Sequence, residues 1–251
     1  MDTLTNITER KRKSSENKSF FDDNGYLIVK DFISNSEHKK LLDVSDYYYQ
    51  KGKGGKDTPR FKYNTNGTMN KIEGACSFEP LFLDLASNET LIDTAQVLSN
   101  IGNEVDVYIS KFFPMEPNGG QSTFMHQDNF YFKGNPNEII SCAVYLQDTN
   151  KDNGCLRIAK SSHNDGIFKH NVDSGMQGIK WINESTINKF EIVDIVEEAP
   201  FAVFFNINSI HGCYENKSDR TRFSLAWEYI SSNNRSVVSS NQLWCDRMTV
   251  R

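Results

Sequence analysis

The chain has 251 residues and a formal net charge of −5 at pH 7, and its hydrophobic (37%) and charged (24%) fractions are those of an ordinary globular domain with a sizeable core. The acidic balance gives no reason to expect nucleic acid as a partner, because nucleic-acid binding depends on a clustered basic surface. No apolar run approaches the roughly 20 residues that cross a bilayer, and the first residues lack the apolar middle of a secretory signal, so we expect no membrane partner.

The N-terminal segment is polar. Residues 1–18 include the charged run 9–13, followed by serines and asparagines, and we interpret the segment as a flexible tail with a solvated charge run. A nuclear address or a phosphate-binding patch is the alternative interpretation of that run. The rest of the chain, residues 19–251, shows no internal repeat and is expected to fold as a single domain.

Helices are expected in the first hundred residues. Ser34 followed by Glu37 is the signature of a capping box, and it predicts a helix that runs toward Tyr47. Residues 50–70 are rich in glycine, lysine and asparagine, which predicts a long irregular loop that could act as a lid over a site. Residues 81–98 carry apolar side chains at helical spacing with one break, which predicts two short helices packed against a sheet.

Strands dominate the rest of the chain. Beyond residue 104 the hydrophobic period changes to the alternation of strands, and the apolar segments are separated by turn residues. Helices followed by many short strands predict a mainly β fold with flanking helices, built as a sandwich or an open barrel. The expected strands are 105–112, 139–146, 156–158, 191–196, 201–205 and 223–230.

The five cysteines indicate a reducing compartment. Their number is odd and no two of them form a Cys-x-x-Cys pair, so neither a disulfide framework nor a zinc site is expected. The last residues form no peroxisomal address, and a cytoplasmic location is the simplest setting. The cysteines are Cys76, Cys142, Cys155, Cys213 and Cys245.

One short motif, His126-Gln127-Asp128, organises the predicted site. In an extended segment, residues two apart point to the same side, so His126 and Asp128 would aim an imidazole and a carboxylate at one point. His211, which follows the apolar segment 201–205, could add a second imidazole from another strand. Two nitrogens and one carboxylate oxygen on one face of a cation suit Fe(II) and leave the opposite coordination positions open.

An arginine eleven residues after His211 is placed to bind a carboxylate. On the last expected strand, Arg222 shares a face with Ser224 and Ala226, while the alternate residues from Phe223 onward share the other face and should pack into the core. The two small residues leave room for a ligand the size of a dicarboxylate. The planar, permanently charged guanidinium can bind such a ligand through two parallel hydrogen bonds.

Taken together, these motifs resemble the phytanoyl-CoA dioxygenase family of Fe(II)- and 2-oxoglutarate-dependent oxygenases. The hallmarks of that family are a His-x-Asp motif, a turn of the Asn-Gly-Cys-Leu kind, a distal His-Gly and a later arginine. Here they correspond to residues 126–128, residues 153–156, His211-Gly212 and Arg222. The resemblance covers roughly residues 20–230.

The resemblance implies a double-stranded β-helix, or jelly roll, that holds Fe(II) through His126, Asp128 and His211 and uses 2-oxoglutarate and O₂ as cosubstrates. It also implies that Arg222 pairs with the C5 carboxylate of 2-oxoglutarate. One departure is that a cysteine stands two residues after the metal histidine, where the family often has a serine. The further residues expected to contact the cosubstrate are Cys213, Ser224 and Lys111.

Asp128 bears on the outcome of the reaction. Related halogenases replace this carboxylate by a small residue so that chloride can bind, and this chain keeps it. Hydroxylation, or desaturation or ring formation, is therefore expected in preference to halogenation. The polar residues around the motif favour a small polar metabolite as substrate. The candidate substrate contacts are Gln127, Asn129, Tyr131 and Tyr108.

Two other functions stay open at this point. The first is an oxygenase that acts on a CoA- or carrier-bound acyl group, which a basic entrance able to hold phosphates would favour. The second belongs to another class: a protein that binds the metal and 2-oxoglutarate without turnover. Formation of succinate from 2-oxoglutarate in the presence of Fe(II) and a substrate separates this binding protein from the two enzymes.

Overall fold

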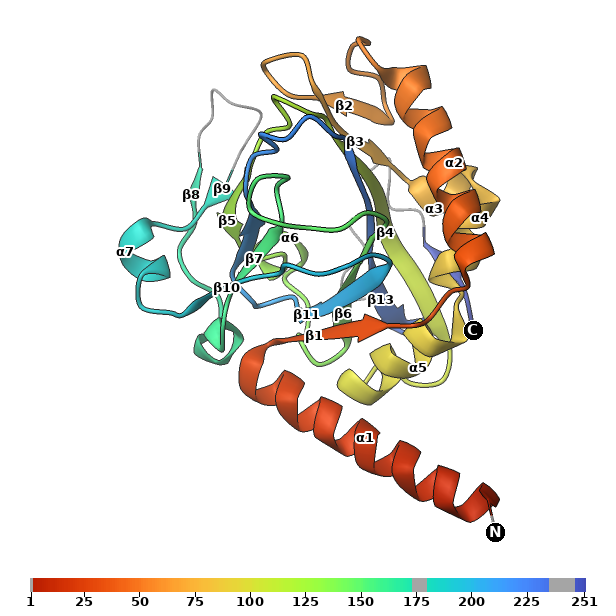
Figure 1. Cartoon of the computed structure of the whole chain (residues 1–251). Helices are drawn as coiled ribbons and strands as arrows, with labels where there is room; N and C mark the ends of the chain where they lie inside the picture. The colour runs from red at the N-terminus through yellow and green to blue at the C-terminus, as the bar shows by residue number, and fades with distance from the viewer. Residues whose placement is uncertain (1, 173–179, 235–246) are drawn as a thin grey trace.

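The computed structural model describes residues 2–172, 180–234 and 247–251, and two antiparallel sheets that face each other form its centre (Figure 1). The large sheet contains, in spatial order, β1 (Tyr26–Lys30), β11 (Phe201–Asn206), β6 (Ile139–Tyr145), β13 (Arg222–Ser231), β4 (Val105–Met115), β3 (Met69–Glu73) and β2 (Phe61–Tyr63), with β14 (Met248–Thr249) paired to β4. The small sheet contains β10 (Ile192–Asp194), β7 (Leu156–Ala159), β12 (His211–Cys213) and β5 (Thr123–His126). This is the double-stranded β-helix that the resemblance implies, and all six expected strands are present.

Helices cover the outer face of the large sheet (Figure 1). The helices are α2 (Asn35–Gly52), α3 (Ala75–Phe78), α4 (Pro80–Ala86) and α5 (Glu89–Leu98). The main hydrophobic cluster lies between them and the sheet, and it includes Phe223, Leu225, Trp227 and Tyr229 from alternate positions of β13. The face of that strand predicted to pack into the core therefore does so, which leaves the opposite face turned toward the small sheet.

The helix boundaries follow their capping residues. Ser34 accepts a hydrogen bond from the backbone N–H of Glu37, whose carboxylate binds the backbone N–H of Ser34 in return, so the predicted capping box starts α2. The helix continues to Gly52, beyond the predicted end at Tyr47. The two helices predicted within residues 81–98 are α4 and α5. No helix in the described part of the chain is long and apolar enough to cross a membrane.

The N-terminal segment differs from its prediction. Instead of an irregular tail over residues 1–18, residues Asp2–Asn24 form helix α1, which projects away from the sheets (Figure 1). A solvated helix and a disordered tail share the same polar composition, and lysine, arginine and glutamate are good helix formers. The i,i+4 ion pair between Lys18 and Asp22 supports the helix, and Phe21 anchors its last turn in the core.

Two segments outside the expected helices and strands contain short elements. The 50–70 segment includes β2 and the start of β3, which form an antiparallel hairpin, so the expectation of a wholly irregular loop is wrong. The segment between η1 (Ser162–Asp165) and β10 contains β8 (Asn171–Val172), β9 (Lys180–Trp181) and α7 (Glu184–Ile187). Both segments lie at the edges of the sheets, where short strands add to the fold without a strong hydrophobic pattern.

Candidate active site

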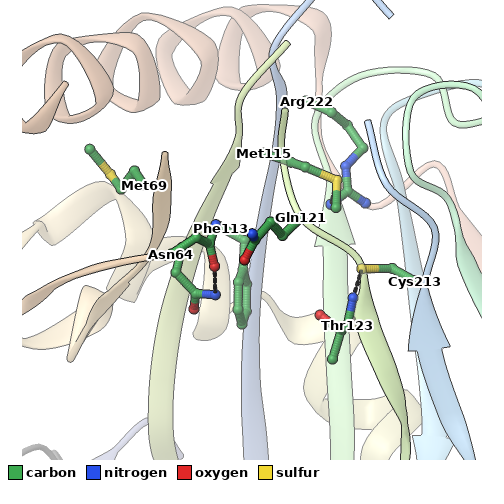
Figure 2. A pocket seen from close by; sticks show the side chains of 10 residues that line it. Asn64, Met69, Phe113, Met115, Gln121, Thr123, Cys213 and Arg222 are labelled. Carbon is green, nitrogen blue, oxygen red and sulfur yellow. Dashed lines mark hydrogen bonds between the residues drawn. The ribbon is translucent and has the colours of Figure 1, made fainter. Parts of the chain in front are cut away.

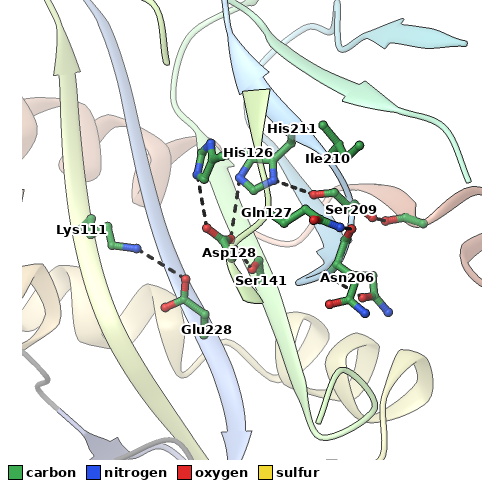
Figure 3. Close-up of polar contacts among 12 residues, drawn as sticks. Lys111, His126, Gln127, Asp128, Ser141, Asn206, Ser209, Ile210, His211 and Glu228 are labelled. Atoms are coloured by element: carbon green, nitrogen blue, oxygen red, sulfur yellow. Dashed lines mark hydrogen bonds and ion pairs between the residues drawn. The ribbon is translucent and has the colours of Figure 1, made fainter. Parts of the chain in front are cut away.

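Three side chains from the small sheet and the turn after it converge on one point. The ligand atoms of His126, Asp128 and His211 all lie within 4.8 Å of one another, as a group that could hold a metal ion. The Nε2 atom of His126 is 3.6 Å from Oδ1 of Asp128, and the Nε2 atom of His211 is 3.7 Å from Oδ2 (Figure 3). Two nitrogens and one carboxylate oxygen on one side of a common centre are the donors that suit Fe(II).

Strand pairing brings the two histidines together across 85 residues of sequence. His211 on β12 is the direct cross-strand partner of His126 on β5. Gly212 makes this close pairing possible, because a Cβ atom at this position would lie 2.5 Å from the carbonyl oxygen of Thr123. The His-Gly dipeptide thus combines an imidazole of the triad with the only residue type that fits between the two strands.

Asp128 reaches the same point by a different route from the one predicted. Strand β5 ends at His126, and Asp128 has helical backbone angles (φ −60°, ψ −37°) at the start of the short helix α6 (Asn129–Phe132). Strand alternation therefore does not orient its side chain. The hydroxyl of Ser141 on β6 donates a hydrogen bond of 2.9 Å to Oδ2 of Asp128 and fixes the carboxylate.

Backbone carbonyls orient both imidazole rings. The Nδ1 atom of His126 lies 2.8 Å from the carbonyl oxygen of Phe124, and the Nδ1 atom of His211 lies 3.0 Å from that of Ser209. A carbonyl oxygen only accepts hydrogen bonds, so each Nδ1 carries the proton and each Nε2 presents its lone pair to the centre. This arrangement is the usual outer support of a metal-binding histidine.

Burial and mutual charge shift the pKa values of Asp128 and His211. Burial alone would raise the pKa of Asp128, but the two histidines outweigh it and hold the pKa of this carboxyl well below its usual range. Burial lowers the pKa of His211 to about 4, although the charge of Asp128 opposes this shift. At neutral pH the carboxylate is therefore ionised and the His211 ring neutral, which are the forms that coordinate a metal.

Arg222 lies in a pocket beside the triad without a partner for most of its donors. The side chain is buried, and among the described residues its Nε and Nη1 atoms have no hydrogen-bond partner. Nη2 is 3.2 Å from the sulfur of Met115, and the guanidinium lies over the ring of Tyr145 at 5.0 Å. A buried guanidinium with unsatisfied donors is costly unless an anion completes it.

The pocket holds about 350 Å³ of empty space, part of it open to solvent. Figure 2 shows Arg222, Met115, Cys213 and Thr123 around it, with Asn64 and Met69 contributed by the β2–β3 hairpin. The segment interpreted from sequence as a possible lid thus does border this pocket. The charge of its arginine suits a dicarboxylate.

The other expected cosubstrate contacts lie at different distances from Arg222. Cys213 lines the same pocket, and its sulfur accepts a hydrogen bond of 3.2 Å from the backbone N–H of Thr123. Ser224 is buried on the same face of β13, two residues from Arg222. Lys111 is on β4 opposite Ala226, further along the sheet, where it forms an ion pair.

Two of the expected substrate contacts are engaged within the protein. The Gln127 side chain is fully buried, and its amide nitrogen donates to the carbonyl oxygens of Gly166 and Asn208. The Asn129 side chain is also buried, and its amide nitrogen donates to Gly134 and Asn208. Both residues therefore brace the loops around the triad, and their side chains leave no donor for a substrate.

The two expected tyrosine contacts differ in exposure. Tyr131 is 44% exposed, packs edge-on against the ring of His126 at 6.1 Å, and has the Lys180 ammonium over its own ring at 4.5 Å. Tyr108 is buried in an apolar cluster and contacts the ring of Phe132. Tyr131 thus remains accessible beside the triad, whereas Tyr108 belongs to the core.

Sequence reasoning missed three residues of this region: Ser141, Tyr145 and Glu228. The first two are on strand β6, whose inward positions follow from the alternation of residues 139–145 once the pairing with β13 is known. Glu228 continues the face of Arg222, Ser224 and Ala226, so the same alternation could have identified it. What the sequence lacks is any signal that this face carries charge deep inside the fold.

A family model described as Phytanoyl-CoA dioxygenase (PhyH) matches residues 21–224 of the chain. Similar curated proteins include a phytanoyl-CoA dioxygenase domain-containing protein 1 homolog from Dictyostelium discoideum, which is 23% identical over 88% of this chain and 92% of its own length. A phytanoyl-CoA dioxygenase from Arabidopsis thaliana is 22% identical over 91% and 92% of the two chains. The peroxisomal phytanoyl-CoA dioxygenase from Homo sapiens is 22% identical over 86% and 68%.

Solved structures show the same fold. EctD from S. alaskensis with 2-oxoglutarate and 5-hydroxyectoine superposes with a TM-score of 0.72 at 19% identity, covering 89% of this chain and 77% of its own. The epimerase SnoN in complex with Fe³⁺, alpha ketoglutarate and nogalamycin RO superposes with a TM-score of 0.71 at 16% identity, covering 88% and 85%. At these identities the likeness concerns the arrangement of the chain.

Proposed function

Since the chain belongs to the phytanoyl-CoA dioxygenase family of Fe(II)- and 2-oxoglutarate-dependent oxygenases, we propose that it oxidises a small-molecule metabolite with release of succinate and CO₂. In this proposal His126, Asp128 and His211 hold Fe(II), and Arg222 binds the C5 carboxylate of 2-oxoglutarate. Hydroxylation, desaturation and ring formation are the outcomes open to such an enzyme.

The observation that carries the proposal is the unsatisfied Arg222 beside a preformed metal triad. Nε and Nη1 of this arginine are buried without a partner among the described residues, and its pocket is lined by Thr123 and Cys213 from β5 and β12, the strands that carry the two histidines. A dicarboxylate that also coordinates the metal would satisfy the arginine and the centre at the same time. A structural arginine would instead have its donors paired within the protein.

Each residue has a defined task in this proposal. Fe(II), 2-oxoglutarate and O₂ supply the oxidising chemistry when bound, and the protein holds and orients them. Ser141 fixes the carboxylate of Asp128. The stacked ring of Tyr145 restricts the guanidinium of Arg222 to one orientation. Ser224 and Cys213 are the proposed polar neighbours of the cosubstrate carboxylate.

An acyl thioester is the second candidate substrate, because several relatives are named phytanoyl-CoA dioxygenases. Those names apply to the relatives, which share less than a quarter of their residues with this chain. We also propose a reducing compartment such as the cytosol, since no disulfide joins the cysteines in the described residues.

The test is formation of succinate from 2-oxoglutarate with Fe(II), O₂ and a panel of metabolites and acyl-CoA thioesters, measured by mass spectrometry. We expect succinate above the metal-free background and none from the Asp128→Ala variant. Equal succinate from the variant and the wild type would overturn the assignment of the triad. Tight binding of 2-oxoglutarate without succinate under any condition would instead indicate a non-catalytic binding protein.

A further inference from the structure

A second pair of buried charged groups faces the triad from the large sheet. Lys111 on β4 and Glu228 on β13 form an ion pair with an Nζ–Oε1 distance of 3.5 Å, and their side chains are only 19% and 3% exposed. Figure 3 shows Lys111 and Glu228 to the left of Asp128 and Gln127 to its right. Charged side chains are rarely placed so deep in a fold unless they are fully paired or bind something.

The register of the sheet places this pair next to the metal ligands. Glu228 is the direct cross-strand partner of Ser141, and the Ser141 hydroxyl binds the carboxylate of Asp128. Direct cross-strand neighbours have Cβ atoms about 5 Å apart. A group bound by Glu228 would therefore lie at the level of the sheet where Ser141 supports Asp128, on the side of the centre that a substrate can approach.

Glu228 is incompletely satisfied. Its Oε2 atom is buried and has no hydrogen-bond partner among the described residues, while Oε1 forms the 3.5 Å ion pair with Lys111. Burial and the nearby charge of Asp128 raise the pKa of Glu228 to about 8, against the opposing effect of Lys111. In the empty site most of this carboxyl is therefore protonated at neutral pH, and a cationic group beside Oε2 would lower the pKa again and favour the carboxylate.

The charged groups around the triad, which are Arg222, Lys111 and Glu228, limit the net charge of a substrate that can bind there. With Fe(II) and 2-oxoglutarate bound, the charges of the metal and Arg222 balance those of Asp128 and the two carboxylates of the cosubstrate. Lys111 and Glu228 balance each other as well once a bound cation keeps Glu228 ionised. A substrate with a single net charge would leave a buried charge without compensation, whereas a zwitterion can pair one group with each residue.

We propose that Lys111 and Glu228 form the recognition site for a small zwitterionic substrate, an amino acid or a close derivative, with its cationic nitrogen at Oε2 of Glu228 and its carboxylate at Nζ of Lys111. This inference rests on the proposed function and specifies its substrate class. It gives Lys111 a substrate role in place of the cosubstrate role implied by the family resemblance.

The first test varies the ligand. Binding to the wild-type protein loaded with Fe(II) and 2-oxoglutarate is measured by calorimetry under nitrogen, where turnover is blocked. The probes are free L-amino acids, their N-acetyl forms, which lack the cation, their amides, which lack the carboxylate, and butyryl-CoA. We expect at least one free amino acid to bind about 10- to 100-fold more tightly than both of its derivatives, as expected for a lost charge-assisted hydrogen bond.

The second test varies the protein. For the tightest amino acid, Glu228→Gln should remove the preference over the N-acetyl form, and Lys111→Met should remove the preference over the amide. Glu197→Gln is the control, because Glu197 forms an ion pair with Lys30 of β1, at the edge of the large sheet away from β4. The control should keep both preferences.

Several outcomes would overturn the inference. They are tighter binding of N-acetyl forms or of butyryl-CoA, no binding of any free amino acid at millimolar concentration, or preferences unchanged in both variants. If succinate forms with a thioester while amino acids fail, the substrate class is wrong and the proposed function stands. If the wild type does not bind 2-oxoglutarate at all, the proposed function itself fails.

Discussion

Replacing Arg222 by methionine separates a cosubstrate-binding arginine from a structural one, because the two roles predict opposite effects on stability. The side chain is 4% exposed, and two of its three nitrogens have no partner among the described residues. Methionine has a similar length and fits an apolar surround that includes Met115 and the ring of Tyr145. The variant removes the charge and keeps most of the volume.

The magnitude follows from burial. Without ligand, Arg222→Met removes an uncompensated buried charge, so the free energy of unfolding should stay unchanged or rise by up to about 4 kcal/mol. With ligand, the variant leaves the C5 carboxylate of 2-oxoglutarate buried and unpaired. That loss is about 3–5 kcal/mol, or roughly two to three and a half orders of magnitude in the dissociation constant.

The assay is thermal unfolding of the protein with Fe(II) under nitrogen, with and without 2-oxoglutarate. At a 2-oxoglutarate concentration about 100 times its dissociation constant, the wild type should gain about 2.7 kcal/mol of stability. At the same concentration, the Arg222→Met variant should gain about 0.4 kcal/mol or less, because its dissociation constant is at least about 100-fold higher.

Arg247 provides the matched control, since it is also a largely buried arginine but is fully paired. It binds Asp106 and the backbone carbonyls of Ser231, Ser232 and Asn234. Arg247→Met should therefore lower the free energy of unfolding by about 3–5 kcal/mol. Loss of stability in Arg222→Met like that of the control, combined with an unchanged effect of 2-oxoglutarate, would refute the role given to Arg222.

Two further predictions concern the fold that carries the site. Gly212→Ala would place a methyl carbon 2.5 Å from the carbonyl oxygen of Thr123, so we expect a loss of about 1–3 kcal/mol in the free energy of unfolding and weaker metal binding. Urea denaturation and metal titration measure these effects, and Gly119→Ala, where the nearest atom is 3.5 Å away, should leave both unchanged. Burial alone would raise the pKa of Asp106, but hydrogen bonds from Arg247 and two hydroxyls outweigh it and lower the pKa. The folded pKa thus lies below that of the unfolded chain, and the carboxylate stabilises the fold above about pH 4 and loses this effect as the pH falls further. Asp106→Asn should therefore lower the free energy of unfolding, measured by urea denaturation, by about 3 kcal/mol at pH 7 and by progressively less below pH 4. An equal loss at pH 7 and at about pH 3 would contradict this link between the pKa and stability.

Much of the fold could be predicted from the sequence because local patterns and long-range packing agree. The capping box at Ser34 and Glu37 determines where α2 starts whatever surrounds the helix. The alternation along β13 separates the core face, with Trp227, from the face with Arg222, because a strand in a two-layer fold has one side for each layer. These signals depend on neighbours within a few residues.

The remaining features depend on contacts that the sequence does not encode locally. The orientation of Asp128 comes from a turn into α6 and a hydrogen bond from Ser141, and a strand pattern gives no sign of either. The Gln127 side chain donates to backbone carbonyls of two loops distant in sequence. Its place between His126 and Asp128 suggests a substrate contact, whereas it braces these loops. The position of Glu228 near the triad becomes evident only from the pairing of β13 with β6, which places it opposite Ser141.

Strand β13 carries both side chains of the site that have buried atoms without a hydrogen-bond partner among the described residues, Arg222 and Glu228. Arg222 and Glu228 are on the same face, six residues apart, which is about 20 Å along a strand. The triad lies nearer the Glu228 end, because Ser141 connects that level of the sheet to Asp128. A diacid bound at Arg222 would therefore extend from the metal in one direction, and a substrate bound at Glu228 would lie in the other. The charges favour this order, since Arg222 attracts a carboxylate and repels a cation, whereas Glu228 is the proposed partner of the substrate cation. The opposite charges at the two ends of one strand thus give each ligand a single favourable place beside the metal.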